Sequence, residues 1–274
     1  PFQVRRSLPV FGRQMVGPFI FLDHVGPGEM ISSEKFDVRP HPHIGLATVT
    51  YLLEGAIVHR DSVGNRQTIV PGDVNWMTAG RGVAHSERTR AEDHGRTVKS
   101  HGFQTWVALP KEREEADPGF AHRDRADLPL IAGDGASVRL AVGSLYGETA
   151  PVATFTDMFL ADATLAAGAV LPLDPEHEER AVYLAEGSID VSSETYEAAR
   201  LIIFKPEVGL AIRALTPARL ILLGGATMDG HRHIWWNFVS SSKERIEQAK
   251  NDWKTGRFDK VFGDEEDYIP LPEK

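Results

Sequence analysis

The sequence predicts an all-β protein of two similar strand-rich domains, each a barrel or a sandwich, with one helix near the C-terminus. Three observations support this fold class. Short segments rich in β-branched and aromatic residues alternate with Gly, Pro, Asn and Asp, and closely spaced strands of this kind favour barrels or sandwiches over alternating strands and helices. A five-residue sequence recurs about half a chain length later, and apolar residues at helical spacing are concentrated near the end.

The first half shows the strand pattern most clearly. Thr48–Leu53 (TVTYLL) is rich in β-branched and aromatic residues and predicts a strand. Val63–Arg66 predicts a hairpin turn before a second strand at Gln67–Val70, and Pro71–Asp73 predicts a further turn. The charged stretch Lys111–Asp127 separates this region from the second half, and we expect it to be a solvated connection.

An internal repeat indicates that the chain holds two copies of one β-domain. Tyr51–Gly55 (YLLEG) recurs 132 residues later as Tyr183–Gly187 (YLAEG), and Ile57 matches Ile189 at the same offset. We therefore expect an N-terminal domain at residues 1–130. A C-terminal domain at residues 131–274 would carry the helix and the tail.

The helix is predicted from a capping signal and an apolar stripe. Ser241 and Glu244 have the spacing of a capping box, in which the two side chains satisfy free backbone N–H groups. The apolar residues that follow lie on one helical face, and a glycine supplies the end of about four turns. These residues are Ile246, Ala249, Trp253 and Gly256. The acidic tail that follows is expected to lie extended on the surface.

Composition excludes several classes of function. The chain contains no cysteine, which rules out disulfides, zinc–thiolate sites, iron–sulfur clusters and thiol nucleophiles. Its net charge of −9 has the wrong sign for direct binding to nucleic acid or to anionic membranes. The apolar run Val16–Leu22 is short and contains Gly17 and Pro18, so we expect neither a signal peptide nor a spanning helix. The expected location is cytoplasmic.

Two short motifs place metal-ligating side chains at strand spacing. In extended backbone, residues two apart point to the same face, so His41 and His43 form one pair and His85 and Glu87 form another. Adjacent strands carrying both pairs would aim three imidazoles and one carboxylate into one cavity. This donor set suits a divalent transition metal better than calcium or magnesium.

Four other histidines are weaker candidates. His231 and His233 form a similar pair, but no second pair or carboxylate accompanies them, and a turn beside the Trp235 and Trp236 core is the simpler interpretation. His177 lies among acidic residues and is expected in a solvated loop. His59 could face the interior and hydrogen-bond to the ligands, or it could be exposed.

The first half resembles the pirin family of the cupin superfamily. The resemblance rests on segments that span nearly all of residues 5–110, and it thins in the second half. These segments are HPHIG at 41–45, TVTYLLEG at 48–55, His59 with Asp61 and Ser62, PGDVNWMTAGRG at 71–82, HSE at 85–87, GPF at 17–19, LDH at 22–24, and Gln104, Trp106, Val107, Leu109 and Pro110.

The resemblance implies a bicupin, that is, two double-stranded β-helix (jelly-roll-like) barrels, with one mononuclear metal in the N-terminal barrel. His41, His43, His85 and Glu87 match the family's ligand positions. The implied metal is iron(II), and nickel, cobalt, copper, manganese or zinc would suit the same donors. At an offset of 132 the four positions fall on Leu173, Pro175, Pro217 and Arg219, and a shifted offset moves the last two to Leu220 and Leu222. We therefore expect a metal-free C-terminal barrel.

The resemblance also implies two different functions. One is a quercetin 2,3-dioxygenase, which opens the flavonol heterocycle and releases carbon monoxide, with Glu87 as the catalytic base on the flavonol hydroxyl. The alternative is a non-enzymatic regulator that binds a protein partner and senses the oxidation state of iron. A metal-dependent isomerase or a small-molecule-binding cupin shares the fold and stays open.

Overall fold

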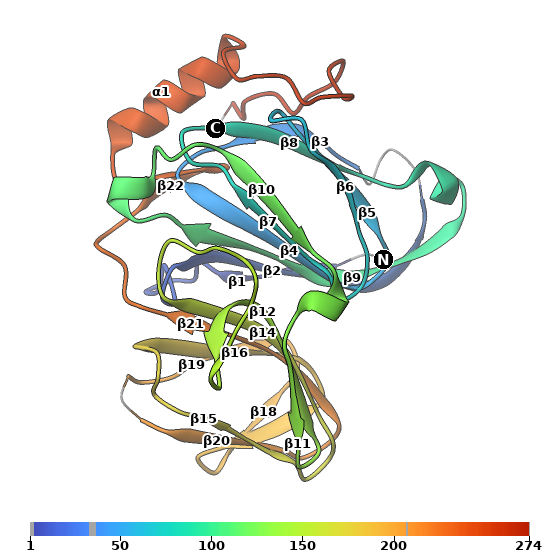
Figure 1. Ribbon diagram of the computed structural model, residues 1–274, viewed down its shortest axis with the longest axis vertical. Coiled ribbons are helices and arrows are strands. Elements are labelled where there is room, and N and C mark those ends of the chain that lie inside the picture. The colour runs from blue at the N-terminus through green and yellow to red at the C-terminus, as the bar shows by residue number, and fades with distance from the viewer. Residues whose placement is uncertain (1–2, 33–36, 207, 274) are drawn as a thin grey trace. The chain divides into compact units, whose positions relative to one another are not determined.

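The computed structural model describes residues 3–32, 37–206 and 208–273 and confirms the all-β fold class (Figure 1). The chain divides into two compact units. Residues up to Val4, 23–122 and 229–274 form the first unit, and residues 5–22 and 123–228 form the second. The helix and the tail, which we expected in the C-terminal domain, therefore belong to the first unit. None of the helices in the described residues has the length and apolar character that crossing a bilayer requires.

The first unit is built mainly on two antiparallel sheets, whose strands have 4 to 13 residues. One sheet has the order β2-β9-β4-β7-β10, with β1 hydrogen-bonded to β2, and the other has the order β3-β8-β5-β6. The strands of these two sheets are β1 (Val4–Leu8), β2 (Phe19–Ile31), β3 (Val38–His43), β4 (Leu46–Glu54), β5 (Ile57–Asp61), β6 (Arg66–Ile69), β7 (Val74–Thr78), β8 (Val83–Arg88), β9 (Thr97–Ala108) and β10 (Gly119–Arg123). Short 3-10 turns lie at Ala91–Asp93, Lys111–Arg113 and Arg125–Asp127. Most of β1, the first residues of β2, the last residue of β10 and the turn Arg125–Asp127 are counted with the second unit.

The stretch Lys111–Asp127 is more ordered than the sequence suggested. It contributes β10 to the sheet beside β7. Glu114 within it is only 5% exposed, because its carboxylate forms an ion pair with the buried Arg232 (2.8 Å). The expectation of a wholly solvated connection was wrong at this residue.

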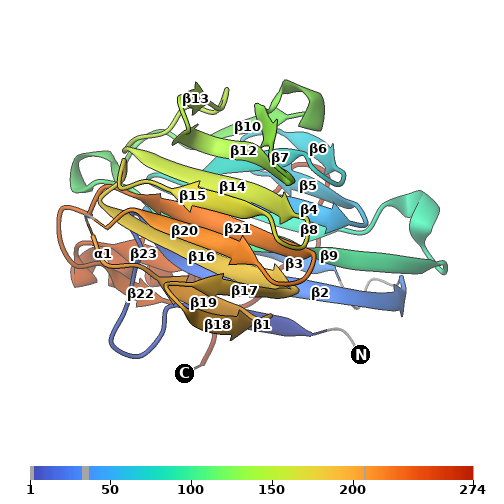
Figure 2. The ribbon, with the colours of Figure 1, turned by 90° about the horizontal axis from the view of Figure 1, so that it is seen from below.

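The second unit repeats the same arrangement of two antiparallel sheets. Figure 2 shows β14, β21 and β16 side by side. The sheet orders are β11-β12-β14-β21-β16-β19, with β13 beside β12, and β15-β20-β17-β18. The strands are β11 (Leu130–Gly133), β12 (Ala136–Leu145), β13 (Glu148–Thr149), β14 (Met158–Leu165), β15 (Val170–Leu173), β16 (Glu179–Glu186), β17 (Ser188–Val191), β18 (Glu194–Glu197), β19 (Arg200–Ile203), β20 (Leu210–Ala214) and β21 (Ala218–Gly225).

The repeat in the sequence corresponds to a repeat in topology. The order β2-β9-β4-β7 matches β14-β21-β16-β19, and β3-β8-β5-β6 matches β15-β20-β17-β18. Tyr51–Gly55 begins in β4 and Tyr183–Gly187 begins in β16, which occupy the same place in the two orders. Both segments end in a glycine with positive φ, +88° at Gly55 and +82° at Gly187. The same left-handed turn conformation therefore explains why both copies of the repeat end in glycine.

The strand pairing corrects the alignment of the second metal-ligand motif. In the first unit, His85 on β8 lies opposite His41 on β3. In the second unit, Leu210 on β20 lies opposite Leu173 on β15, which is the counterpart of His41. The structural counterpart of His85 is therefore Leu210.

The same reasoning places Glu87. It lies opposite His59 on β5, and its counterpart Ile212 lies opposite Val191 on β17. The positions suggested by constant offsets lie at or beside β21, which corresponds to β9, because fewer residues connect the strands in the second copy. Those positions were Pro217, Arg219, Leu220 and Leu222.

The C-terminal helix α1 (Lys243–Lys254) forms where the sequence predicts it, but its cap is one residue later. Ser242 is the N-cap, and its side-chain oxygen accepts a hydrogen bond from the backbone N–H of Arg245 (3.2 Å). Ser241 is occupied elsewhere, since its hydroxyl donates to Glu114 (3.0 Å). Gly256 follows the helix with φ +69°, as a C-terminal glycine should.

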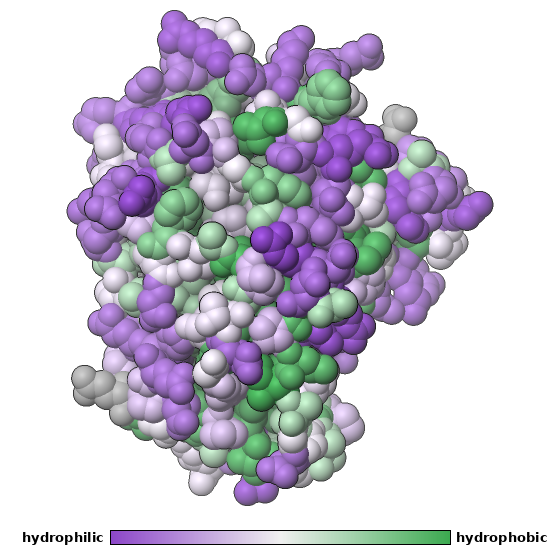
Figure 3. Space-filling view, viewed as in Figure 1, coloured by the Kyte–Doolittle hydropathy of each residue, from purple (hydrophilic) through white to green (hydrophobic). Residues whose placement is uncertain are grey.

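Helix α1 packs against an aromatic cluster of the first unit. Ile246 and Ala249 are buried, and they form one cluster with Ile44 and Phe238. The hairpin of β22 (His233–Trp235) and β23 (Phe238–Ser240) leads into the helix. The outer face of α1 is charged, and the surface over it is mainly hydrophilic at the upper left of Figure 3.

Candidate metal centre

Three of the four predicted ligands meet inside the first barrel. His41 and His85 lie directly opposite each other on neighbouring strands β3 and β8, and His43 follows on the same face of β3. All three are buried, with exposed fractions of 7%, 2% and 1% for His41, His43 and His85. One nitrogen from each ring lies within 4.8 Å of the others, a grouping that could hold a metal ion.

Hydrogen bonds orient two of these rings from behind. Nδ1 of His41 donates to the carbonyl of Arg39 (2.9 Å), and Nδ1 of His43 donates to the carbonyl of Asn237 (3.1 Å). A carbonyl can only accept, so each ring carries its hydrogen on Nδ1 and leaves the lone pair of Nε2 free. This is the arrangement that a metal-ligating histidine needs.

The spacing of the nitrogens fits a single ion. Nε2 of His43 and Nε2 of His85 are 3.1 Å apart. Two imidazole nitrogens that bind one ion at right angles, each at about 2.1 Å, would be about 3.0 Å apart. The donor set of three imidazoles therefore fits a transition metal both in chemistry and in spacing.

Burial keeps these imidazoles neutral. It lowers the pKa of His41 to about 4, against a weaker opposing effect of the hydrogen bond to Arg39. Burial and the charge of His41 lower the pKa of both His43 and His85 well below the ordinary value. At neutral pH all three rings are therefore unprotonated and available as ligands.

Glu87 lies beside the histidine group rather than within it. It follows His85 by two residues on β8 and is half-buried. Among the described residues, the group of mutually close donor atoms that includes His41, His43 and His85 does not include Glu87. Its Oε1 lies 3.5 Å from the hydroxyl of Thr50, which donates a shorter hydrogen bond of 2.8 Å to Gln104. Burial raises the pKa of Glu87, which the nearby His59 and Thr50 partly offset. Its role as fourth ligand stays a prediction.

Two residues of this interior were not assigned from the sequence. His59 is 4% exposed, so of the two interpretations the interior one is correct, and Asp61 is fully buried. Nε2 of His59 lies 3.1 Å from a carboxylate oxygen of Asp61, and its Nδ1 lies 3.4 Å from Nδ1 of His85. The spacing of His59 and Asp61, two residues apart on one strand, was the available signal.

The second histidine pair has a structural explanation. Between His231 and His233, the side chain of Arg232 is fully buried and forms an ion pair with Glu114. The two histidine rings are partly or fully exposed with centroids 4.9 Å apart, and no third metal-ligating side chain among the described residues joins them.

His177 is not in a solvated loop, contrary to expectation. It is 5% exposed. Its Nδ1 lies 2.8 Å from a carboxylate oxygen of Asp157, and its Nε2 donates to the carbonyl of Ser144 (2.8 Å). These contacts bury the ring although its sequence neighbours are acidic.

A cavity continues the inner face of the first barrel beyond Glu87. It measures about 340 Å³, and its lining includes Ile57 and Thr89. Ile57 lies two positions before His59 on β5, so strand alternation places its side chain on the same inner face, and Thr89 directly follows β8. The rest of its lining combines apolar and charged side chains, including Met30, Leu52, Val98, Glu54, Arg90 and Lys99.

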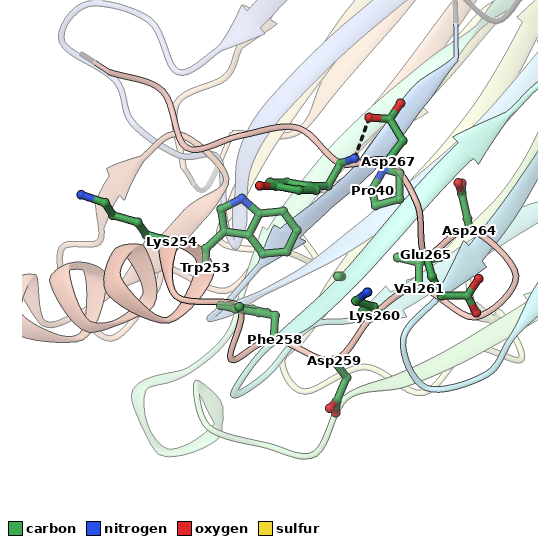
Figure 4. Close-up of a pocket in the computed structure, with 13 residues that line it drawn as sticks. Pro40, Trp253, Lys254, Phe258, Asp259, Lys260, Val261, Asp264, Glu265 and Asp267 are labelled. Atoms are coloured by element: carbon green, nitrogen blue, oxygen red, sulfur yellow. Dashed lines mark hydrogen bonds between the residues drawn. The ribbon is translucent and has the colours of Figure 1, made fainter.

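A second cavity lies on the opposite face of the ligand-bearing strands (Figure 4). It measures about 280 Å³ and is lined by Pro40 and Ala84, each of which immediately precedes a metal-site histidine. Trp253 and Phe258 form an aromatic wall. Because neighbouring residues of a strand point to opposite faces, this cavity is separate from the histidine group.

Comparisons with known proteins decide the family. The family model "Pirin" matches residues 1–107, and the model "Pirin C-terminal cupin domain" matches residues 160–259. A pirin-like protein of Caulobacter vibrioides is 46% identical over 276 residues, which cover 99% of this chain and 95% of that protein. The chain belongs to the pirin family.

Other pirin relatives carry the name of an enzyme. A Pseudomonas aeruginosa protein named "Putative quercetin 2,3-dioxygenase" is 37% identical to this pirin and covers 99% of this chain and 86% of its own. A crystal structure of quercetin 2,3-dioxygenase from Acinetobacter baumannii matches with a TM-score of 0.89 at 30% identity, covering 99% of this chain and 91% of that one. These matches confirm the predicted pair of cupin barrels.

Proposed function

We propose that this pirin is a metal-dependent dioxygenase of the quercetin 2,3-dioxygenase type. It would bind one iron(II) ion in the N-terminal barrel through His41, His43, His85 and Glu87. Its substrate would be a flavonol such as quercetin, whose heterocycle is opened with uptake of dioxygen and release of carbon monoxide. The relatives that carry this enzyme name support the proposal.

The observation that carries the proposal is the convergence of three buried, neutral imidazoles. His41 and His43 are held by backbone carbonyls, and the Nε2 atoms of His43 and His85 have the spacing of two ligands on one ion. Three or four protein ligands leave positions open on a metal that prefers six. When bound, the metal would supply a Lewis acid for the substrate oxygens and a redox centre for dioxygen.

The surrounding residues can handle the substrate proton. Burial raises the pKa of Glu87, which makes its carboxylate a stronger base than an exposed glutamate. Glu87 would accept the proton of the flavonol 3-hydroxyl at a carboxylate oxygen. The hydrogen bond from Thr50 to Gln104 holds these two side chains next to Glu87. A flavonol that is already deprotonated in solution would need only the ligand role of Glu87.

The inner cavity offers a place for the substrate rings. Its volume of about 340 Å³ lies at the lower end of the size usual for small-molecule sites. Met30, Leu52 and Val98 supply apolar surface for an aromatic system. The charged pair of Glu54 and Lys99 (3.1 Å) belongs to the same lining and could meet phenolic hydroxyls.

Reconstitution tests the proposal directly. The metal-free protein is loaded with iron(II) under anaerobic conditions, with each of the other divalent metals, or with none. Loss of quercetin absorbance and release of carbon monoxide are then followed after dioxygen is admitted. We expect turnover with iron(II) and none without metal. The absence of turnover with every metal would overturn the dioxygenase and leave the regulator as the alternative.

Variants of the ligands test the site independently of the substrate. Metal content is measured in the wild type, in His43→Ala and in Glu87→Gln. We expect His43→Ala to lose the metal and Glu87→Gln to bind it more weakly. His231→Ala is the matched control, because it removes an exposed histidine from the second pair. Full metal content in both ligand variants would show that the ligand set is wrong.

A further inference from the structure

We propose that Asp61 and His59 are positioning residues that set the tautomer of His85 through a chain of two hydrogen bonds. The inference rests on the proposed metal centre, because it concerns which nitrogen of His85 is free to bind the ion. It differs from the ligand assignment in that neither Asp61 nor His59 would touch the metal. This chain of hydrogen bonds runs from the hairpin after β5 to the centre of the histidine group.

The hydrogen-bond partner of Nδ1 in His85 differs in kind from those of the other two proposed ligands. His41 and His43 each donate from Nδ1 to a backbone carbonyl, which can only accept a hydrogen bond. Nδ1 of His85 instead lies 3.4 Å from Nδ1 of His59. An imidazole nitrogen can donate or accept, so the direction of this bond depends on what holds His59.

Asp61 fixes that direction. The carboxylate is fully buried, and its Oδ1 accepts hydrogen bonds from the backbone N–H groups of Val63 (3.1 Å) and Asn65 (2.9 Å). The Asn65 side chain donates to both carboxylate oxygens. Burial raises the pKa of Asp61, but the hydrogen bonds from His59 and Asn65 outweigh it and hold the pKa below its ordinary value. An ionised carboxylate only accepts, so Nε2 of His59 must carry a hydrogen.

The consequence passes to His85. An imidazole that carries its one hydrogen on Nε2 has a lone pair on Nδ1, and in this arrangement Nδ1 of His85 donates to Nδ1 of His59. Nε2 of His85 then carries the lone pair, and this is the atom that lies 3.1 Å from Nε2 of His43. Phe120 stacks on the His59 ring with centroids 4.5 Å apart and an angle of 19°, which holds the ring in the plane that the chain requires.

The strand pairing explains why the chain can form. Asp61 lies directly opposite His85, and His59 lies opposite Glu87. Because side chains two apart share a face, Asp61, His59 and His85 all point inward from two adjacent strands. The tight hairpin after Asp61 supplies the N–H donors that keep the carboxylate in place.

The first experiment reads the tautomers in the metal-free protein by 15N–1H correlation NMR of the histidine rings. We expect His85 to carry its hydrogen on Nδ1 in the wild type. In Asp61→Asn the amide oxygen keeps the N–H donors of the hairpin, so the amide NH2 faces His59 and reverses both hydrogen bonds. His85 would then carry its hydrogen on Nε2. An unchanged His85 tautomer in Asp61→Asn would overturn the inference.

The second experiment measures affinity for cobalt(II) by its visible absorbance in competition with a chelator. Loss of such a supporting partner typically lowers metal affinity by about 10- to 100-fold, which we expect for Asp61→Asn and for His59→Leu. His59→Gln is the matched variant, since its amide can donate to Asp61 and accept from His85, and we expect it to keep most of the affinity. Equal affinity of His59→Leu and His59→Gln would contradict the chain.

These readouts separate the inference from the proposed function. A wild type that binds no cobalt would overturn the metal centre, while the tautomers of the metal-free protein would still decide whether Asp61 controls His85. If Asp61→Asn fails to fold, as judged by circular dichroism, the variants His59→Leu and His59→Gln test the inference instead. Retention of the wild-type His85 tautomer in His59→Leu would then overturn the inference.

Discussion

The two barrels share one topology but fill their interiors with opposite chemistry. In the first barrel, the facing positions of β3 and β8 hold His41 and His85. The equivalent positions of the second barrel hold Leu173 and Leu210. Leu173 is fully buried in a continuous apolar core. The same scaffold can thus hold either a polar site or a conventional core.

The difference extends to the neighbouring strand. His59 and Glu87 face each other in the first barrel, whereas Val191 and Ile212 face each other in the second. Every counterpart of the proposed site is therefore apolar, and no described donor replaces it there. The shared topology determines where a metal site can lie, and the inward-facing residues determine whether its donor atoms are present. The metal-free state of the second barrel remains a prediction.

Making the first barrel resemble the second should have the largest effect. His41→Leu introduces the residue found at the equivalent position of β15, and it removes one of three converging nitrogens. We expect the metal content after reconstitution to fall from one ion per chain to none, measured by elemental analysis. Retention of a full equivalent of metal by this variant would break the proposed distinction between the barrels.

Damage to the second barrel should lower stability without affecting the metal. Leu173 has no exposed surface, so Leu173→Ala should lower the free energy of unfolding by about 2–5 kcal/mol, measured by urea denaturation. Leu215→Ala is the control, because Leu215 is 44% exposed and its loss should change stability by at most about 0.5 kcal/mol. A fall in metal content in Leu173→Ala would show that the second barrel supports the site.

Acid should destabilise the metal-free protein through the first barrel. The pKa of His41 is about 4 in the folded protein and its ordinary value is 6.5, so the unfolded chain binds the proton more tightly. Stability is therefore complete above about pH 6.5 and falls as the pH drops toward 4, with about 3 kcal/mol from this residue. Urea denaturation at several pH values measures it, and His41→Leu should show a flatter profile.

The smallest expected effect concerns the tail, which contacts the first barrel. Asp264 forms two hydrogen bonds of 2.8 Å with Arg88 on β8, and both side chains are mostly buried. Asp264→Asn should lower stability by about 1 kcal/mol and speed hydrogen exchange in β8 but not in β20. Glu247→Gln, which weakens an exposed pair with Lys250, should cost less than about 0.5 kcal/mol. Equal changes in β8 and β20 would contradict a local role for the tail.

The sequence allowed the fold class and the grouping of three histidines to be predicted, while their role as ligands stays a prediction. His41 and His43 share a face by strand alternation alone, and the YLLEG repeat indicated two copies of a domain. The helix was expected from its apolar stripe, but the cap moved from Ser241 to Ser242 because Glu114, distant in sequence, binds Ser241.

The features that could not be predicted depend on pairing between distant strands. The counterpart of His85 is Leu210 because the loops of the second copy are shorter, and no constant offset could show this. His177 is buried by Asp157 and by the carbonyl of Ser144, neither of which is a sequence neighbour. The chain from Asp61 to His85 likewise needed the register of β5 against β8.

The hydrogen bond between His43 and Asn237 has a consequence for how the protein is made. Nδ1 of a proposed ligand on β3 is held by a carbonyl 194 residues further along the chain. The ribosome must therefore synthesise the whole second barrel before it delivers the partner that orients this ligand. The second barrel can complete its core during synthesis, but the first must wait for residues 229–274. Metal loading would accordingly follow the synthesis of residues 229–274, which include the carbonyl that orients His43.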